Sequence, residues 1–501
     1  MKSSKLVRRL DVHIQPDISR VIALLFVAGQ EFGSGAGSRA SSVVGRIMAL
    51  SESDVKRRLK DVILRFGRRH RDIIAVFSQH ADRVSARLEP SDELSEERWL
   101  LLGASFTHEY SVEAASICNP SMVLHPDQSS APPGCARFVM SFRGMGEGHL
   151  SSIGFRTGLI DANGDVTFEA RGPFPMIGAV RDGIFHRDTF HVRLKAMNRD
   201  GESTSYVLDH LPAVFTIEEL ETRLELLISE QDTRHDAAVI ANHHRSIAAS
   251  SYGVHFDPET DLSERVLWPV MSAESNGMED ARFVRFVNAD DSVTYLATYT
   301  AFDGQQIAQQ LLQTNDFIDF AMSPVVGAAS ANKGLAIFPR LVNGQYAALS
   351  RYDRETNAVC FSDTLGHWGN AVTFQLPERD WEVLQLGNCG SPIETSVGWL
   401  VLTHGVGPMR TYSIGAILLD LESPATMIAS LKEPLITAAS DEQDGYVPNV
   451  VYTCGAMLHG DVLVIPYGVA DMRINIATVR LSELLDAMTP IFDPVDVDAL
   501  T

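Results

Sequence analysis

Cysteine is scarce in this chain of 501 residues, and no two cysteines stand at a CxxC spacing. The five cysteines are odd in number and far apart: Cys118, Cys135, Cys360, Cys389 and Cys454. This pattern is neither a disulfide framework nor a zinc site, so we predict no structural metal. Unpaired thiols are typical of a reducing compartment, and we expect a cytoplasmic protein.

Long hydrophobic runs are also missing. The longest apolar stretch near the start, residues 21–29, is shorter than the roughly 20 residues that cross a bilayer, and no convincing cleavage site follows it. We therefore expect no association with a membrane.

Positive charge is in deficit, with a net charge of −22. This balance argues against nucleic acid as a partner, because phosphate backbones recruit clustered Lys and Arg. The deficit is uneven: residues 1–100 carry 18 basic against 13 acidic residues, and the rest carry 24 against 51. We expect the N-terminal segment to pack on the acidic body or on a second copy of it, and we predict a homo-oligomer.

Residues 1–105 are predicted to form a helical N-terminal segment. From Asp54 to Leu88 apolar residues recur at spacings of three, four and seven, with Arg and Lys between them. This periodicity is typical of one or two amphipathic helices. Ser51 and Ser53 are candidate N-caps, and Gly67 is a candidate break.

Residues 106–501 are predicted to be all-β, apart from a helical insertion at Glu218–Asp236. Short apolar or alternating runs follow one another between Gly, Asp, Asn and Pro, for example ARFVMSF, VTYLATYT and GDVLVIPYG. There is no alternation of strands with helices, and the strands are too many for a simple sandwich. A five-bladed β-propeller, with four strands in each blade, fits this length.

The segment Gly277–Arg282 (GMEDAR) is the strongest candidate for chemistry. Adjacent acids Glu279 and Asp280 stand beside Arg282 directly before a strand. An arginine can orient one carboxylate while the other transfers a proton, although a surface turn has the same composition.

EDAR is followed in order by YLATYTA, NKGLAIFPRLVNGQYAALSRY, GWLVLTHGVGPMRTYSIGAILLDLESP, VPNVVYTCG and VLVIPYGVAD. Together these motifs resemble glycoside hydrolase family 130, from about Asn119 to about Leu481. The resemblance implies a five-bladed propeller that acts on β-mannosides as a phosphorylase or a mannosidase. Residues 1–100 lie outside the part that the family shares.

The resemblance also implies roles for single residues. Asp280 would be the general acid, with Ala281 where the family often has Pro. The mannosyl unit would be bound by Asn119, Arg143 and Asp471. Phosphate would be held by Lys333, Arg351, His404 and Tyr412. The family usually has an acid after that lysine, and this chain has Gly334.

These residue types suit phosphorolysis. An inverting hydrolase needs a second carboxylate to activate water. A phosphorylase instead needs cations and hydrogen-bond donors that hold an anionic nucleophile. We therefore expect an inverting β-mannoside phosphorylase that yields α-mannose 1-phosphate, with phosphate as co-substrate and no cofactor. The alternatives are a β-mannosidase, with Glu394 as one candidate base, and a sugar-binding propeller without catalysis.

Other residues carry weaker hypotheses. Glu147 and His149 lie in the glycine-rich stretch Arg143–His149, which lacks the Lys-Ser/Thr ending of a phosphate loop. We expect a tight loop between strands, and both residues are candidates to face the cleft. Glu109 and Glu113 lie near Asn119 in sequence and are candidates for an acceptor subsite. The pair His243–His244 is predicted to be solvated, because no further metal ligands can be assigned to it.

Overall fold

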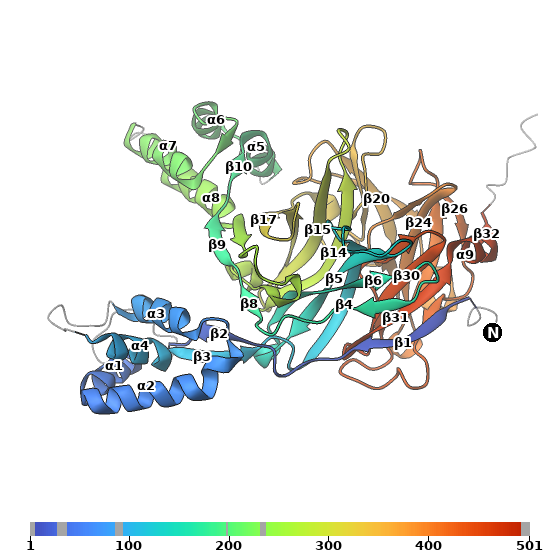
Figure 1. Cartoon of the computed structure of the whole chain (residues 1–501). Coiled ribbons are helices and arrows are strands. Elements are labelled where there is room, and N and C mark those ends of the chain that lie inside the picture. The colour runs from blue at the N-terminus through green and yellow to red at the C-terminus, as the bar shows by residue number, and fades with distance from the viewer. Residues whose placement is uncertain (1–5, 28–37, 86–93, 197–198, 231–236, 492–501) are drawn as a thin grey trace, which may run out of the picture.

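The computed structural model describes residues 6–27, 38–85, 94–196, 199–230 and 237–491. Most of its regular structure is antiparallel β-structure, as the sequence predicts, with two groups of helices and the short helix α9 (Leu481–Ala487) (Figure 1). No helix among the described residues is long and apolar enough to cross a membrane.

Within the sheets, five runs of four neighbouring antiparallel strands can be followed, here called arrays 1 to 5. Arrays 1 and 2 belong to one 12-stranded sheet, in which β6 pairs parallel with β14. Array 1 is β4 (Ser116–Leu124), β5 (Ala136–Met145), β6 (Ser151–Ile160) and β7 (Val166–Phe168). Array 2 is β14 (Gly277–Val287), β15 (Val293–Phe302), β16 (Ile307–Thr314) and β17 (Asp319–Pro324), extended by β12 (Tyr252–His255) and β9 (Ala179–Asp182). Array 3 is β18 (Ala336–Ile337), β19 (Tyr346–Ser350), β20 (Asn357–Ser362) and β21 (Ala371–Gln375). Array 4 is β22 (Gln385–Asn388), β24 (Gly398–Gly407), β25 (Thr411–Leu419) and β26 (Met427–Ser430).

Array 5 takes its outer strand from the start of the chain. Its strands are β28 (Val451–Tyr452), β30 (Val462–Val469), β31 (Arg473–Arg480) and β1 (Arg8–Ile14), and β1 pairs antiparallel with β31. The sequence pattern predicts a mostly helical segment here and gives no strand. Leu10, Val12 and Ile14 alternate with polar residues and pack against the core between arrays 5 and 1, as expected of a half-buried strand.

The N-terminal helices are α1 (Arg39–Met48), α2 (Glu52–Phe66), α3 (Ile73–Val84) and α4 (Glu96–Ser105). The Ser51 side chain accepts a hydrogen bond from the Asp54 amide and begins α2, and Gly67 follows its last residue, so both predicted boundaries are confirmed. The strands β2 (Val21–Leu25) and β3 (Thr107–Ser111) pair with each other and connect the helices to array 1.

Basic residues of the N-terminal segment bind acids of the β-structure. Arg20 Nε lies 2.6 Å from Glu113 Oε1, and Arg71 Nη2 lies 2.5 Å from Glu264 Oε2. Both carboxylates are almost fully buried. These contacts fix the segment against the acidic body.

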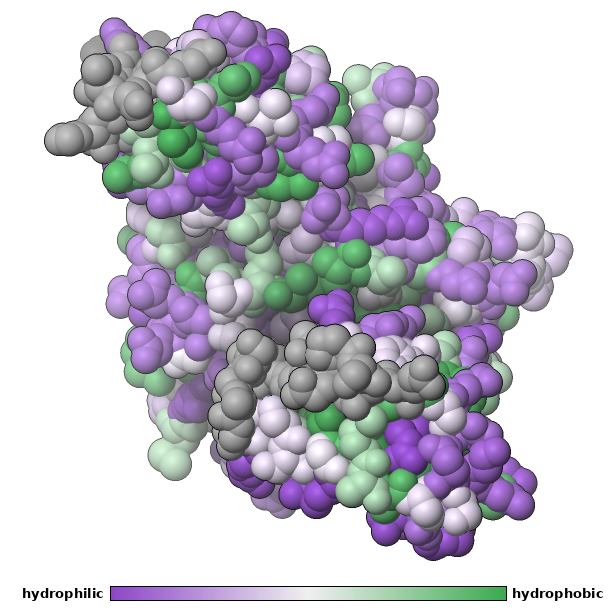
Figure 2. All heavy atoms as spheres, turned by 90° about the vertical axis from the view of Figure 1, so that its left-hand side faces the viewer, coloured by the Kyte–Doolittle hydropathy of each residue, from purple (hydrophilic) through white to green (hydrophobic). Residues whose placement is uncertain are grey.

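The second group of helices is larger than the predicted insertion. It comprises α5 (Arg187–Ala196), α6 (Glu202–Asp209), α7 (Ile217–Glu230) and α8 (Ala237–Ala249), around a core of its own. Residues 231–236 of the predicted insertion lie outside the described residues. His244 on α8 is fully buried beside Phe190, so the prediction of a solvated histidine pair is wrong for this residue. Both helical groups project from the same side of the strands, and Figure 2 shows the hollowed face between them.

Candidate active site

All eight residues proposed from the sequence line one cavity of about 250 Å³, here called the polar cavity. They are Asn119, Arg143, Asp280, Lys333, Arg351, His404, Tyr412 and Asp471. Sequence reasoning missed Gln385, Arg410, Val447, Val450 and Tyr452 in its lining. Four of these five stand in quoted motifs, which were their only signal: Val447, Val450 and Tyr452 in VPNVVYTCG, and Arg410 in GWLVLTHGVGPMRTYSIGAILLDLESP.

Backbone irregularities turn three acidic or amide side chains into the polar cavity. The register of β4 shifts between Cys118 and Ser121, and that of β14 shifts between Glu279 and Arg282. Within these bulges Asn119 has φ 51° and Asp280 has φ 55°; Asp471, in a loop, has φ 51°. A left-handed conformation costs a residue with a side chain on the order of 1–3 kcal/mol, and such strain is typical of functional sites.

Arg282 holds the backbone around Asp280. Its Nη1 donates to the Asp280 carbonyl oxygen over 2.8 Å, and its Nη2 lies 3.8 Å from Asp280 Oδ2. Its Nε donates to the Cys389 carbonyl oxygen, and its Nη2 donates to the Tyr452 hydroxyl. Arg282 therefore joins array 2 to arrays 4 and 5.

The charge around Asp280 sets its protonation. Burial by itself raises the pKa of this carboxyl, but Lys333, Arg282, Arg143 and Arg351 together outweigh burial and hold the pKa below 3.8. The free site thus favours the carboxylate. An anion bound to these cations would oppose their effect and favour the protonated acid.

Glu279, next to Asp280, is engaged by two cations. Arg143 Nη2 donates to Glu279 Oε1 over 2.6 Å, and Lys333 Nζ lies 3.6 Å from Glu279 Oε2. The motif predicts that Arg282 orients one of the two acids. Glu279 is instead held by Arg143 from array 1, while Arg282 lies beside Asp280.

Arg351 and His404 lie next to each other in another part of the polar cavity, both against Gly387. Arg351 Nε is buried and makes no hydrogen bond to a described residue. His404 is also buried, and the Asn388 backbone lies beside its ring. The His404 ring stacks on Tyr412 at 6.0 Å between centroids. Burial, followed by Arg351 and Arg282, lowers the pKa of His404 well below 6.5, so its imidazole is neutral.

Two glycines make room for Arg351. A Cβ atom on Gly387 would lie 2.2 Å from Arg351 Nε and 2.8 Å from His404 Cε1. Gly334 has φ 106°, and a Cβ atom there would lie 2.9 Å from Arg351 Cδ. An acidic side chain after Lys333 would therefore be strained and would crowd the guanidinium, which explains glycine at this position in this chain.

Asp471 differs from Asp280 in the direction of its pKa shift. Burial raises its pKa to about 6, with Arg143 opposing and Asp280 adding to the rise. The Ser116 hydroxyl donates to the Asp471 carbonyl oxygen and ties this loop to β4. The polar cavity thus holds one acid that is readily ionised and one that is protonated more easily.

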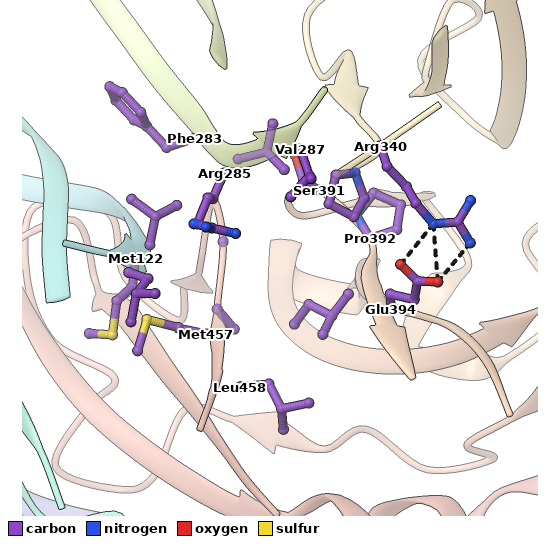
Figure 3. Close-up of a pocket in the computed structure, with 17 residues that line it drawn as sticks. Met122, Phe283, Arg285, Val287, Arg340, Ser391, Pro392, Glu394, Met457 and Leu458 are labelled. Carbon is purple, nitrogen blue, oxygen red and sulfur yellow. Dashed lines mark hydrogen bonds and ion pairs between the residues drawn. The ribbon is translucent and has the colours of Figure 1, made fainter. Parts of the chain in front are cut away.

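Several weaker candidates lie elsewhere. Glu394 binds Arg340 in a separate cavity of about 510 Å³, here called the apolar cavity, so it is not a base for the Asp280 site (Figure 3). Glu113 is buried between Arg20 and Arg156. Glu109 binds Arg69 and His70, and His149 Nδ1 lies 2.8 Å from the Tyr446 hydroxyl. None of these residues lines the polar cavity.

The family model Glyco_hydro_130, described as beta-1,4-mannooligosaccharide phosphorylase, matches residues 232–490. The chain belongs to glycoside hydrolase family 130. Among its relatives, a 1,2-beta-oligomannan phosphorylase of Thermoanaerobacter sp. is 34% identical over 43% of this chain and 74% of its own length. A beta-1,2-mannobiose phosphorylase of Listeria innocua is 31% identical over 48% of this chain and 67% of its own length.

The solved structures that resemble this family 130 chain include a beta-1,2-mannobiose phosphorylase from Listeria innocua in complex with beta-1,2-mannobiose. It is 22% identical, covers 75% of this chain and 92% of its own, and has a TM-score of 0.45. Among the described residues, no group of three or more His, Cys, Asp or Glu side chains could hold a metal ion.

Proposed function

We propose that this chain is an inverting phosphorylase that cleaves β-mannosides with inorganic phosphate and releases α-mannose 1-phosphate. One observation carries the proposal: Asp280 shares a cavity with His404 and with Arg351, whose buried Nε has no partner among the described residues. A buried donor without a partner is costly, and a bound oxyanion would satisfy it. The names of the relatives agree with this activity.

Asp280 is the proposed proton donor. In an inverting phosphorolysis a phosphate oxygen forms a bond to the anomeric carbon as the bond to the leaving oxygen breaks, and the leaving oxygen takes up a proton. The structure gives Asp280 a fixed backbone and a cationic surrounding. Phosphate that binds near these cations would raise the pKa of Asp280 and so prepare it as an acid.

The remaining residues divide into two proposed groups. Asn119, Arg143 and Asp471 would bind the mannosyl unit with Asp280. Lys333, Arg351, His404 and Tyr412 would hold phosphate. His404 is neutral and can still donate one ring N–H, while Lys333 and Arg351 supply positive charge.

We also propose that the five arrays are the blades of a five-bladed propeller. Segments of all five arrays, at or next to their first strands, line both the polar and the apolar cavity, as expected of strands around one axis. Each array contributes one residue to the polar cavity and one to the apolar cavity. In array order these are Asn119 and Met122, Asp280 and Phe283, Lys333 and Pro339, Gln385 and Ser391, and Tyr452 and Met457. Pairing of β1 with β31 would then close the ring.

Hydrolysis is the second candidate, and one observation favours it. Asp471 and Glu279 line the same cavity as Asp280 and offer the second carboxylate that an inverting hydrolase requires. Glu279 already binds Arg143 and Lys333, so Asp471 is the better candidate base.

The test is to incubate the protein with β-1,2- and β-1,4-mannobiose, with and without phosphate. We expect mannose 1-phosphate only when phosphate is present. Arg351→Ala should weaken phosphate use by about 1.5–3 kcal/mol and affect sugar binding much less. Arg65→Ala, on the exposed face of α2, is the matched control. Free mannose at an equal rate in phosphate-free buffer would show that the chain is a β-mannosidase.

We also propose a cytoplasmic location for the chain. All five thiols are free, which is consistent with a reducing, cytoplasmic location. Phosphate is expected as co-substrate without a further cofactor, and the chain is expected to assemble as a homo-oligomer.

A further inference from the structure

A third cavity, of about 740 Å³, lies between the inserted helices and the outer strands of array 2, and we call it the insertion cavity. Its lining comes from α5, from β9, β12 and β17, and from residues 363–366 of array 3. None of these residues lines the polar cavity. The insertion cavity is therefore separate from the proposed catalytic site.

Arg193 of α5 lines the insertion cavity, and only 6% of its surface is exposed. It forms no hydrogen bond or ion pair with any residue that the structure describes, and its Nε is a buried atom without a partner. A Cβ atom on Gly366 would lie 3.2 Å from Arg193 Nε and 3.3 Å from Nη2. The guanidinium thus lies close over a backbone that carries no side chain.

An arginine in this setting lacks a counter-charge. Burial alone lowers the pKa of Arg193 to about 10, with no neighbouring acid acting on it. The acids of the lining do not supply the missing charge. Asp319 binds Arg181 and His255, Asp363 accepts from Gln345, and Asp182 is exposed at the edge. A buried cation without a partner is strongly destabilising, so a binding role would account for its presence.

Two hydroxyl groups in the same lining are also unsatisfied. Ser251 Oγ and Thr364 Oγ1 are buried and make no hydrogen bond to a described residue. Ser251 follows α8, and Thr364 belongs to the loop that carries Gly366. A hydroxyl both donates and accepts, so these atoms suit a ligand that carries hydroxyl groups of its own.

We propose that the insertion cavity binds a small hydroxylated oxyanion, a sugar phosphate or a sugar acid, with Arg193 as the residue that binds its anionic group. Arginine matches the geometry of both phosphate and carboxylate groups. Ser251 and Thr364 would bind hydroxyl or oxyanion oxygens. Binding here would join the inserted helices to arrays 2 and 3 and leave the polar cavity free for substrate.

The test begins with the full chain carrying Lys333→Ala and Arg351→Ala, which removes the proposed phosphate site from the polar cavity. Thermal unfolding is followed while mannose 6-phosphate, gluconate or neutral mannose is added. We expect one or both anions, but not mannose, to raise Tm in a saturable way. A response to mannose 6-phosphate alone identifies a phosphate ester, and a response to gluconate alone identifies a carboxylate.

Adding Arg193→Gln should raise the half-saturating anion concentration at least roughly tenfold, as loss of a charge-assisted hydrogen bond predicts. Arg245→Gln, which removes a charge from α8 outside the cavity, should leave it unchanged. Gly366→Ala crowds the Arg193 guanidinium without changing the charge, and it should also weaken anion binding. If Arg193→Gln does not fold, the half-saturating anion concentration of Gly366→Ala tests the proposal in its place. The proposal is overturned if no anion raises Tm more than mannose does, or if both Arg193→Gln and Gly366→Ala keep the original half-saturation.

Discussion

Arg282 lies beside Asp280 and does not neutralise it by a direct hydrogen bond. The guanidinium Nη2 lies 3.8 Å from the carboxylate, while Nη1 donates to the carbonyl oxygen of the same residue over 2.8 Å. The arginine therefore holds the strained backbone of Asp280 and leaves its carboxyl oxygens free for a substrate. A carboxyl group that is fixed in place but still available is what proton transfer requires.

Asp280→Asn keeps the size of this side chain and removes its proton. General acid catalysis typically contributes roughly 10²–10⁴-fold, so kcat should fall by at least about that factor while mannoside binding persists. Initial rates and substrate binding would be measured on the same preparation. Glu394→Gln, a change of acid to amide in the apolar cavity, should retain its turnover. Near-normal turnover of Asp280→Asn would remove this residue from the mechanism.

Gly387→Ala tests the space that Arg351 occupies. The added methyl group would lie 2.2 Å from Arg351 Nε, so the guanidinium must move from its place beside His404. We expect KM for phosphate to rise at least several-fold, with a smaller change in the affinity for mannoside. Gly45→Ala, where a Cβ atom would contact nothing within 4 Å, is the control. Unchanged phosphate kinetics would mean that Arg351 does not bind phosphate.

Asp471 predicts a dependence of stability on pH. Its pKa is about 6 in the folded chain against an ordinary 3.8, so its contribution to stability is complete below 3.8 and is lost as pH rises through 6. Asp471→Asn cannot ionise. Its free energy of unfolding should exceed that of the wild type above pH 6, by on the order of 2 kcal/mol, and the difference should fade towards pH 4. Urea denaturation near pH 4 and above pH 6 measures the free energy of unfolding of both proteins. A difference that does not change with pH would contradict the prediction.

Glu113→Gln tests how the N-terminal segment is fixed. Glu113 is buried and binds both Arg20 and Arg156, so the amide leaves two buried cations without their counter-charge. Breaking a buried ion pair costs about 3–5 kcal/mol. Asp61→Asn breaks the exposed pair with Arg65 on α2 and should cost less than about 1 kcal/mol. Equal losses for the two variants, measured by chemical denaturation, would contradict this account.

Much of the fold follows from local patterns that the sequence shows directly. The periodicity of residues 54–88 predicted α2 and α3 because each helix buries one apolar face, with Ser51 as the cap of the first. The β1 strand was missed although Leu10, Val12 and Ile14 alternate, because its partner β31 begins at Arg473 and no local signal points to it. The extent of the insertion was also missed, since α5 and α6 are short and weakly amphipathic.

The site residues were found through motifs and not through geometry. Nothing in the spacing of Asn119, Asp280 and Asp471 shows that all three adopt a left-handed backbone or that they share one cavity. Glu394 was a plausible base from its residue type alone, and only its pairing with Arg340 places it elsewhere. Arg193 could not be predicted from the sequence, because neither its burial nor its lack of a partner distinguishes it there from other helical arginines.

The pairing of β1 with β31 has a consequence for biosynthesis. The Arg8 side chain donates to the Thr478 hydroxyl, a contact across 470 positions of the chain. During synthesis, β1 leaves the ribosome long before β31 has been synthesised. Until then its apolar residues Leu10, Val12 and Ile14 remain exposed to solvent. Contacts this distant in sequence slow folding, and uncovered strands invite aggregation. The nascent chain is thus most exposed to chaperones and proteases until residues 473–480 have been synthesised.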